Sequence, residues 1–131
     1  MKVIIPMAGR GDRFVDKGYK KPKPLIKVNG KMIIEYILDM FDNTDEITFI
    51  CNDDHVNYTL IESILKKLSP SSKVVSLPNH KKGPIYTMMP FLDMVKDEEP
   101  VIVCYCDNPL IWNKKDFFRY VENNDLDGCI L

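Results

Sequence analysis

The feature that most constrains this chain is a short apolar strand that runs directly into a glycine turn near the amino end. Residues Val3–Ile5 form a continuous apolar run, which is typical of a parallel-sheet strand covered on both faces. Pro6 follows, and then a turn of small residues made by Ala8, Gly9, Arg10 and Gly11. Glycines in such a turn let the backbone approach a ligand closely and direct its N–H groups toward it. A strand followed by this turn predicts a phosphate-binding loop.

Cationic side chains accompany the turn. They are Arg10, Arg13 and, after a second loop, Lys23. Arginine and lysine beside backbone donors suit a polyphosphate, because its charge is spread over many oxygens. The alternative is an ordinary strand-to-helix turn with solvated basic residues. The dinucleotide motif G-x-G-x-x-G is not met, because Phe14 occupies the third glycine position, and the P-loop motif G-x-x-x-x-G-K-[ST] is absent.

Composition narrows the class of protein. The chain has 131 residues, with 18 basic and 19 acidic side chains and a net charge of −1. This balance gives no general attraction to nucleic acid or to a membrane surface, and no apolar run approaches the length of a membrane span. The four cysteines lack the spacing of a zinc site, and three of them lie in or beside apolar strand-like runs. We therefore predict reduced thiols and a cytoplasmic protein.

Strands and helices are predicted to alternate along the chain. The apolar patterns indicate strands over 3–5, 47–51, 73–77 and 101–105. They indicate helices over 31–43, from a cap at Asp53 or Asp54 to residue 68, from Gly83 onward, and after Asn113–Asp116, which resembles a capping box. The third helix is expected to turn Ile85, Met88, Met89 and Leu92 inward and to be kinked or shortened at Pro90. This alternation predicts an α/β fold, a Rossmann-like parallel sheet flanked by helices, with residues 1–131 as one nucleotide-binding domain.

The last residues read as the start of a fifth strand. Residues 127–131 (Asp-Gly-Cys-Ile-Leu) end the sequence inside an apolar run. We therefore expect the amino-terminal part of a longer chain or, alternatively, a short protein whose sheet is completed by a partner. The free edge of such a sheet would favour self-association, and hence a homo-oligomer.

A second chemical feature follows the strand predicted over 101–105. Asp107 lies just beyond that strand, at the edge of an open α/β sheet where ligands bind and where the glycine turn also opens. A carboxylate beside a polyphosphate suits Mg²⁺, which takes one or two carboxylates together with phosphate oxygens. The alternative role for Asp107 is that of a turn former before Asn108-Pro109. In combination with the glycine turn, the pattern favours a metal ligand.

Three segments resemble the sugar-phosphate nucleotidyltransferases. They are Pro6–Phe14 (PMAGRGDRF), Pro22–Ile26 (PKPLI) and Gly30–Glu35 (GKMIIE), and Cys106-Asp107-Asn108 is similar to the metal-binding segment of that family. The resemblance implies that Gly9 and Gly11 line the nucleotide, that Arg13 and Lys23 neutralise its phosphates during catalysis, and that Asp107 holds Mg²⁺. It also implies that residues 78–83, with Asn79 and Gly83, read the base.

The implied reaction is attack by a phosphate oxygen of a sugar 1-phosphate on the α-phosphorus of an NTP, with release of pyrophosphate, for surface polysaccharide synthesis. Related branches activate phosphocholine-like acceptors. Pro84-Ile85-Tyr86 replaces the usual small residues after Gly83, and Asp12 stands where Thr or Ser is common. A non-catalytic nucleotide-binding or regulatory module and a subunit of a split enzyme are the alternatives. We expect these 131 residues alone to bind Mg·NTP weakly without turnover, because the later half of such enzymes supplies most of the acceptor pocket.

Overall fold

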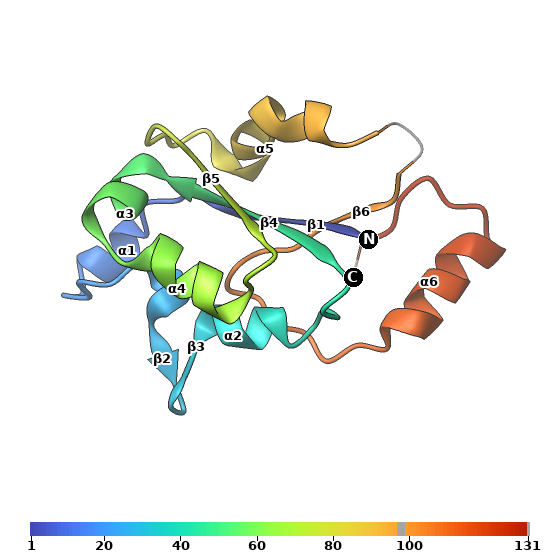
Figure 1. Cartoon of the computed structure of the whole chain (residues 1–131), viewed down its shortest axis with the longest axis horizontal. Coiled ribbons are helices and arrows are strands. Elements are labelled where there is room, and N and C mark those ends of the chain that lie inside the picture. Colours follow the sequence, from blue (N-terminus) through green and yellow to red (C-terminus); the bar gives the residue numbers. More distant parts are fainter. Residues whose placement is uncertain (97–98, 131) are drawn as a thin grey trace.

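A four-stranded parallel sheet forms the centre of the structure (Figure 1). Its strands are β1 (Lys2–Met7), β4 (Glu46–Asn52), β5 (Lys73–Leu77) and β6 (Val101–Val103), in the spatial order β5-β4-β1-β6. All neighbouring strands are parallel, as the register of β1 against β4 and β6 shows. The computed structural model describes residues 1–96 and 99–130. Within them, the predicted α/β fold and all four predicted strands are confirmed, although β6 ends two residues early.

Helices cover both faces of this sheet. α2 (Ile33–Leu38) and α4 (Ile61–Leu68) lie on one face, below the sheet in Figure 1. α5 (Gly83–Met88) and the 3-10 helix η2 (Met89–Met94) lie on the other. Burying a Leu, Ile or Phe side chain contributes about 1.5–3 kcal/mol, so both layers stabilise the central strands. The fully buried side chains of the first layer are Ile34, Ile37, Ile61, Leu65, Val3, Ile5, Phe49 and Cys51.

The predicted helix over 31–43 is wrong at both ends. A two-stranded hairpin, β2 (Lys27–Val28) and β3 (Lys31–Met32), precedes it. Asn29 and Gly30 form its turn with φ angles of 50° and 83°, the left-handed conformation that two-residue hairpin loops require. The helix itself is only α2, because Asp39 closes it and single-turn contacts follow. The Asn-Gly pair was the signal for this hairpin.

The helix predicted to run to residue 68 is also divided. α3 (Asp53–Tyr58) and α4 are separate, because the Thr59 hydroxyl donates to the His55 carbonyl at 2.5 Å and accepts from the Ile61 amide at 3.2 Å. These bonds replace the helical pattern at that point. The cap of α3 is neither Asp53 nor Asp54. Asn52 caps it, accepting from the His55 amide at 2.7 Å.

The third predicted helix is correct in its start and in being shortened near Pro90. It begins at Gly83 and gives way to η2 before Pro90, which cannot donate a helical hydrogen bond. The predicted inward face is correct only for Met88, which packs against the sheet. Ile85, Met89 and Leu92 are 72%, 58% and 56% exposed, because Thr87, Met88 and Phe91 occupy the inner face instead.

The carboxyl-terminal region lies beside the sheet rather than on it (Figure 1). α6 (Lys114–Asn123) begins at Asn113, whose side chain accepts from the Asp116 amide at 3.2 Å, which confirms the predicted cap. The predicted fifth strand over 127–131 is not formed over 127–130, which are irregular. A strand needs a hydrogen-bonded neighbour, and no described strand pairs with this segment. Residue 131 lies outside the described residues.

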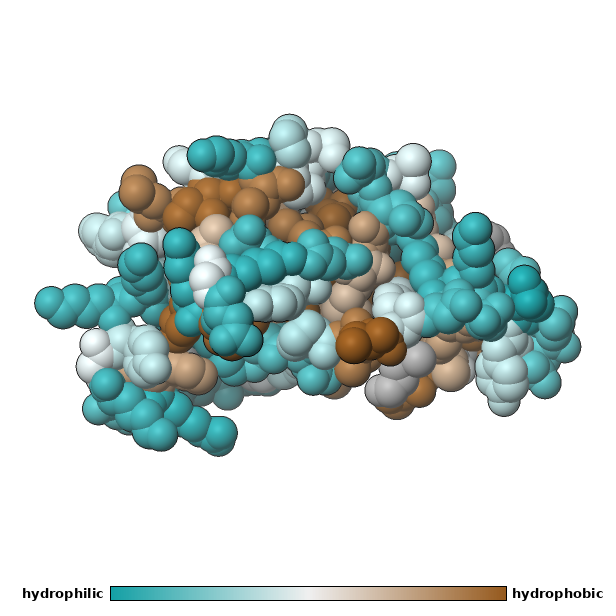
Figure 2. Space-filling model, turned by 90° about the horizontal axis from the view of Figure 1, so that it is seen from below, coloured by the Kyte–Doolittle hydropathy of each residue, from teal (hydrophilic) through white to brown (hydrophobic). Residues whose placement is uncertain are grey.

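The surface mixes hydrophilic and hydrophobic side chains. Seen from below, hydrophilic residues cover much of the molecule, and hydrophobic patches lie between them (Figure 2). Within 1–96 and 99–130, no helix has the length and apolar character needed to cross a membrane.

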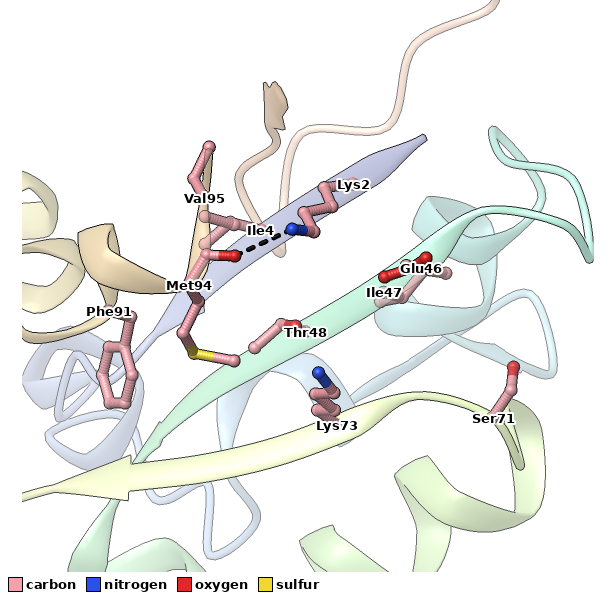
Figure 3. A pocket seen from close by; sticks show the side chains of 10 residues that line it. All are labelled: Lys2, Ile4, Glu46, Ile47, Thr48, Ser71, Lys73, Phe91, Met94 and Val95. Atoms are coloured by element: carbon pink, nitrogen blue, oxygen red, sulfur yellow. Dashed lines mark hydrogen bonds between the residues drawn. The ribbon is translucent and has the colours of Figure 1, made fainter. Parts of the chain in front are cut away.

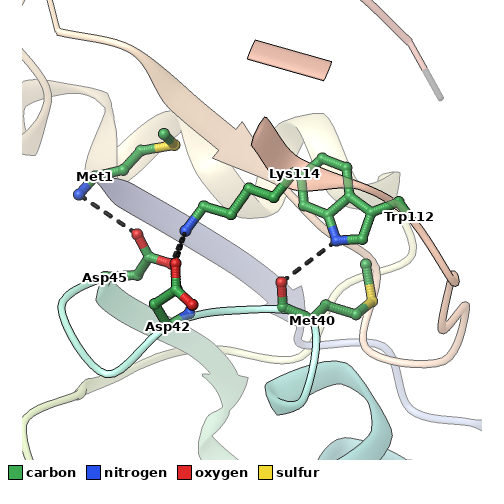
Figure 4. A network of polar contacts seen from close by, with 6 residues as sticks. All are labelled: Met1, Met40, Asp42, Asp45, Trp112 and Lys114. Atoms are coloured by element: carbon green, nitrogen blue, oxygen red, sulfur yellow. Dashed lines mark hydrogen bonds and ion pairs between the residues drawn. The ribbon is translucent and has the colours of Figure 1, made fainter. Parts of the chain in front are cut away.

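A buried carboxylate ties the start of α6 to the rest of the fold (Figure 4). Asp45, between α2 and β4, has a side chain only 3% exposed. It accepts a hydrogen bond from Lys114 and lies 3.6 Å from the amino terminus of Met1. Burial opposes the charge, but Lys114, the Asp42 amide and the amino terminus together outweigh it and hold the pKa of Asp45 below its ordinary value. Trp112 adds a second link, since its indole N–H donates to the Met40 carbonyl at 3.3 Å.

Replacing Asp45 by Asn should destabilise the protein in a pH-dependent way. A carboxylate with a lowered pKa contributes stability above its unfolded-state pKa, and this contribution is lost as the pH falls through the folded-state pKa. We expect Asp45→Asn to reduce the free energy of unfolding by about 1–3 kcal/mol at pH 7, and by much less near pH 3. Urea titrations measure both. Asp42→Asn is the control, because Asp42 also contacts Lys114 but has a side chain 72% exposed. Equal losses at both pH values would contradict this role.

Candidate functional site

An open cleft of about 410 Å³ lies at the carboxyl ends of β1 and β6, next to the amino end of α5. It brings together four segments that are separate in the sequence: the glycine turn, Lys23 with Pro24, the loop before α5 with the start of that helix, and the loop after β6. Of the predicted site residues, it gathers Ala8, Gly9, Arg10, Gly11, Lys23, Gly83 and Asp107. Arg13 and Asn79 do not line it.

The glycine turn owes its shape to backbone conformation and to one buried side chain. Gly11 has φ 69°, and its carbonyl accepts from the amides of Phe14 and Val15, which starts the short helix α1 (Asp12–Val15). Asn52, which is 1% exposed, donates from its side chain to the Ala8 carbonyl at 3.3 Å. Asn52 therefore fixes the turn against β4 as well as capping α3. The sequence prediction missed this residue, although a polar side chain at the end of an apolar strand was a signal for it.

Lys23 and Asp107 form an ion pair on one wall of the cleft. Lys23 begins the 3-10 helix η1 (Lys23–Leu25), and the two following residues, Pro24 and Leu25, are buried and anchor it. The Lys23 ammonium also lies 5.1 Å from the centre of the Phe14 ring. Both charged side chains are 31% exposed, so solvent and ligands can reach the pair. A cation and a carboxylate at one point can separate to serve a phosphate and a metal respectively.

The loop before α5 forms another wall of the cleft. His80, Lys81, Gly83 and Thr87 line it, whereas the Asn79 side chain donates to Asp54 instead. The Lys81 ammonium lies 3.6 Å from Asp12, whose other carboxylate oxygen lies 3.4 Å from Arg10. Asp12 therefore links the glycine turn to this loop.

Arg13 is the second residue of α1, two positions after Gly11, and its side chain is exposed. To act on a ligand in the cleft, its side chain would have to turn toward it.

The cysteine in the cleft is not set up as a nucleophile. Burial, followed by the neighbouring charge of Asp107, raises the pKa of the Cys106 thiol to about 12. A thiol with this pKa stays protonated near neutral pH and reacts slowly. All four cysteines are free, and of these Cys51 and Cys104 are buried.

The donor set of the cleft fits a metal only together with a ligand. Among residues 1–96 and 99–130, no three His, Cys, Asp or Glu side chains gather where they would hold an ion. Asp107 is the carboxylate on the β6 side of the cleft, and Mg²⁺ commonly uses one or two carboxylates plus phosphate oxygens and water. The residues present therefore suit Mg²⁺ that arrives with a polyphosphate.

A smaller cavity, of about 200 Å³, lies at the opposite end of the sheet (Figure 3). Lys2, Thr48, Lys73 and Phe91 are among the residues that line it. The Lys2 ammonium already donates to the Met94 carbonyl at 2.8 Å and to Glu99 at 2.6 Å. Ligands of open α/β sheets bind at the carboxyl ends of the strands, and this cavity lies at the amino ends. The larger cleft is therefore the candidate site.

Fold and cleft together define an NTP transferase domain. Residues 3–121 match the family model of the MobA-like NTP transferase domain, and the chain belongs to that family. A 2-C-methyl-D-erythritol 4-phosphate cytidylyltransferase from Thermosipho africanus is 26% identical over 128 residues, which cover 96% of this chain and 54% of that protein.

Solved structures share the fold. A nucleoside-diphosphate-sugar pyrophosphorylase from Vibrio cholerae superposes with a TM-score of 0.67 at 18% identity, covering 88% of this chain and 52% of the other. A UDP-glucose pyrophosphorylase complexed with UDP-glucose gives 0.67 at 17% identity, covering 95% and 54%. This chain spans about half the length of each of these three proteins.

The two glycines of the turn should respond differently to alanine. Gly11→Ala should cost about 1–2 kcal/mol of stability, because a Cβ disfavours the left-handed conformation that Gly11 adopts. Gly9→Ala should change stability by less than about 0.5 kcal/mol, because a Cβ there meets no atom within 4 Å. Thermal and urea unfolding of both variants measure this difference. Equal destabilisation by the two substitutions would contradict this account of the turn.

Proposed function

We propose that this chain forms the nucleotide-binding half of an enzyme that transfers a nucleoside monophosphate from an NTP to a phosphate acceptor. The acceptor is a sugar 1-phosphate or a related phosphate, such as a phosphocholine-like compound. An acceptor phosphate oxygen attacks the α-phosphorus, and the bond from the α-phosphorus to the bridging oxygen breaks. Pyrophosphate leaves with the electron pair of that bond.

The observation that carries the proposal is the meeting of the glycine turn, Lys23 and Asp107 in one cleft. Phosphoryl transfer depends on positioning and on stabilising charge rather than on an acid–base pair. Backbone N–H groups of the turn and the Lys23 ammonium would bind phosphate oxygens. Asp107 would hold Mg²⁺, which neutralises part of the triphosphate charge. Membership of the NTP transferase family, and the names of relatives that act on phosphates or nucleotide sugars, support the same reaction class.

A screen of pyrophosphate release by the full-length protein tests the proposal. Each NTP is combined with sugar 1-phosphates and with phosphocholine, and Mg²⁺ is present throughout. We expect release that depends on one NTP and on one class of phosphate. If the protein binds an NTP but no combination of NTP and acceptor gives turnover, the result favours the non-catalytic module. If the protein binds no NTP, the proposed nucleotide site is refuted.

Lys23→Ala should leave the fold intact and lower kcat about 10²- to 10³-fold, with a smaller change in KM. The reason is that this cation acts on charge that grows toward the transition state. Arg13→Ala should act in the same direction if the Arg13 side chain turns into the cleft. Lys20→Ala is the control, because Lys20 is exposed and does not line the cleft. An unchanged kcat for Lys23→Ala would show that Lys23 is an ordinary surface charge.

Asp107→Asn should weaken NTP binding in the presence of Mg²⁺ but not in its absence. With Mg²⁺, we expect weaker NTP binding and a higher Mg²⁺ requirement for activity, because a ligand is lost. Without Mg²⁺, we expect NTP binding equal to or tighter than in the wild type, because a negative charge is removed and Lys23 loses its partner. Calorimetry in both conditions measures these changes. Unaltered binding and Mg²⁺ dependence would exclude Asp107 as a ligand.

A further inference from the structure

A ring of hydrogen bonds closes the loop before α5. The Lys82 amide donates to His80 Nδ1 at 3.2 Å, and His80 Nε2 lies 3.1 Å from Thr87 Oγ1. The Thr87 hydroxyl donates to the Gly83 carbonyl at 3.2 Å. The side chains of His80 and Thr87 therefore join both ends of the 80–83 turn to the second turn of α5.

The direction of these hydrogen bonds indicates which nitrogen of the His80 imidazole carries the proton. His80 Nδ1 accepts from an amide, so it carries no proton. The Thr87 hydroxyl has one proton, and it is directed at the Gly83 carbonyl, so Thr87 Oγ1 accepts from His80 Nε2–H. These contacts match the tautomer of His80 that carries its proton on Nε2.

Packing supports the same arrangement. The imidazole of His80 lies 4.8 Å from the ring of Tyr86 in an edge-to-face geometry, and the Lys82 ammonium lies 4.3 Å from the centre of that ring. Thr87 is 3% exposed, so loss of its hydroxyl would leave His80 Nε2–H and the Gly83 carbonyl without this partner. Gly83 adopts φ 86°, a conformation that other residues rarely hold. The ring therefore holds the loop in one shape.

The 80–83 loop lies on a wall of the cleft, so its shape affects what the cleft can bind. His80, Lys81 and Gly83 line one wall of the cleft, whereas Lys23 and Asp107, the groups suited to phosphate and metal, lie on another. If the triphosphate of a nucleotide binds at Lys23 and the glycine turn, its uncharged nucleoside must contact a different part of the cleft. Discrimination among bases depends on hydrogen-bonding groups held in fixed places, because an unpaired buried group is costly.

We propose that His80 and Thr87 are positioning residues that hold the 80–83 loop in the shape that receives the nucleoside part of the NTP. The proposal rests on the nucleotidyltransferase function proposed above. It assigns to these two side chains an effect on NTP choice and NTP affinity, and little effect on the transfer step itself.

The decisive comparison is Thr87→Val against Thr87→Ser in the full-length protein. Valine keeps the shape of threonine and removes the hydroxyl, whereas serine keeps the hydroxyl. We expect Thr87→Val to raise the KM for the preferred NTP about tenfold and to narrow the preference over the other NTPs, with kcat changed less than threefold. Thr87→Ser should stay near the wild type. Calorimetric titration with each Mg·NTP should give the same order.

Two further measurements keep the test independent of folding and of turnover. ¹⁵N NMR of the histidine side chains should show His80 with Nδ1 unprotonated and Nε2 protonated. His80→Gln should also reduce the preference among NTPs, and it replaces Thr87→Val in the test if that variant does not fold. His80 is half-buried, so this substitution is less disruptive than one at the buried Thr87.

A protonated Nδ1, or equal NTP preference in Thr87→Val and Thr87→Ser, would overturn the inference while leaving the proposed function intact. Absence of NTP binding by the wild-type protein would refute both.

Discussion

The parallel pairing of β1 between β4 and β6 is the constraint on which the rest of the structure depends. Parallel strands end at the same edge of a sheet, so the turn after β1 and the loop after β6 open side by side. This arrangement brings the glycine turn next to Asp107, although nearly a hundred residues separate them in the sequence. β1 is buried on both faces, by α2 and α4 on one side and by α5 and η2 on the other. Asn52 links the turn after β1 to β4 through its bond to the Ala8 carbonyl.

The charged side chains that line the cleft are paired with one another. Lys23 is paired with Asp107, and Asp12 lies between Arg10 and Lys81. Exposed pairs of this kind contribute little stability, so a polyanion accompanied by a divalent cation can separate them at low cost. The same contacts keep Lys23 and Arg10 beside the cleft, where an incoming phosphate would meet them. Asp107 and Asp12 thus contact the same cations that the phosphate groups of a bound nucleotide would contact.

The sequence predicted what depends on local pattern, and it failed where tertiary contacts decide. The strands and the grouping of Gly9, Gly11, Lys23 and Asp107 followed from apolar runs and from the rule that ligands bind at strand ends. Periodicity alone did not reveal that Thr59 would divide a helix, or that Thr87 rather than Ile85 would face the sheet. Nor does it show that Asn79 turns to Asp54, away from the cleft. Those outcomes depend on hydrogen bonds to particular neighbours.

A crystal structure of the full-length protein with Mg²⁺ and a non-hydrolysable NTP analogue tests the central claim most directly. The account predicts phosphate oxygens against the backbone of Gly9–Gly11 and the Lys23 ammonium. It also predicts Asp107 separated from Lys23, with a carboxylate oxygen about 2.0–2.1 Å from the metal. A nucleotide bound elsewhere, such as in the cavity beside Lys2 and Phe91, or a Lys23–Asp107 pair that stays closed beneath the bound triphosphate, would contradict it.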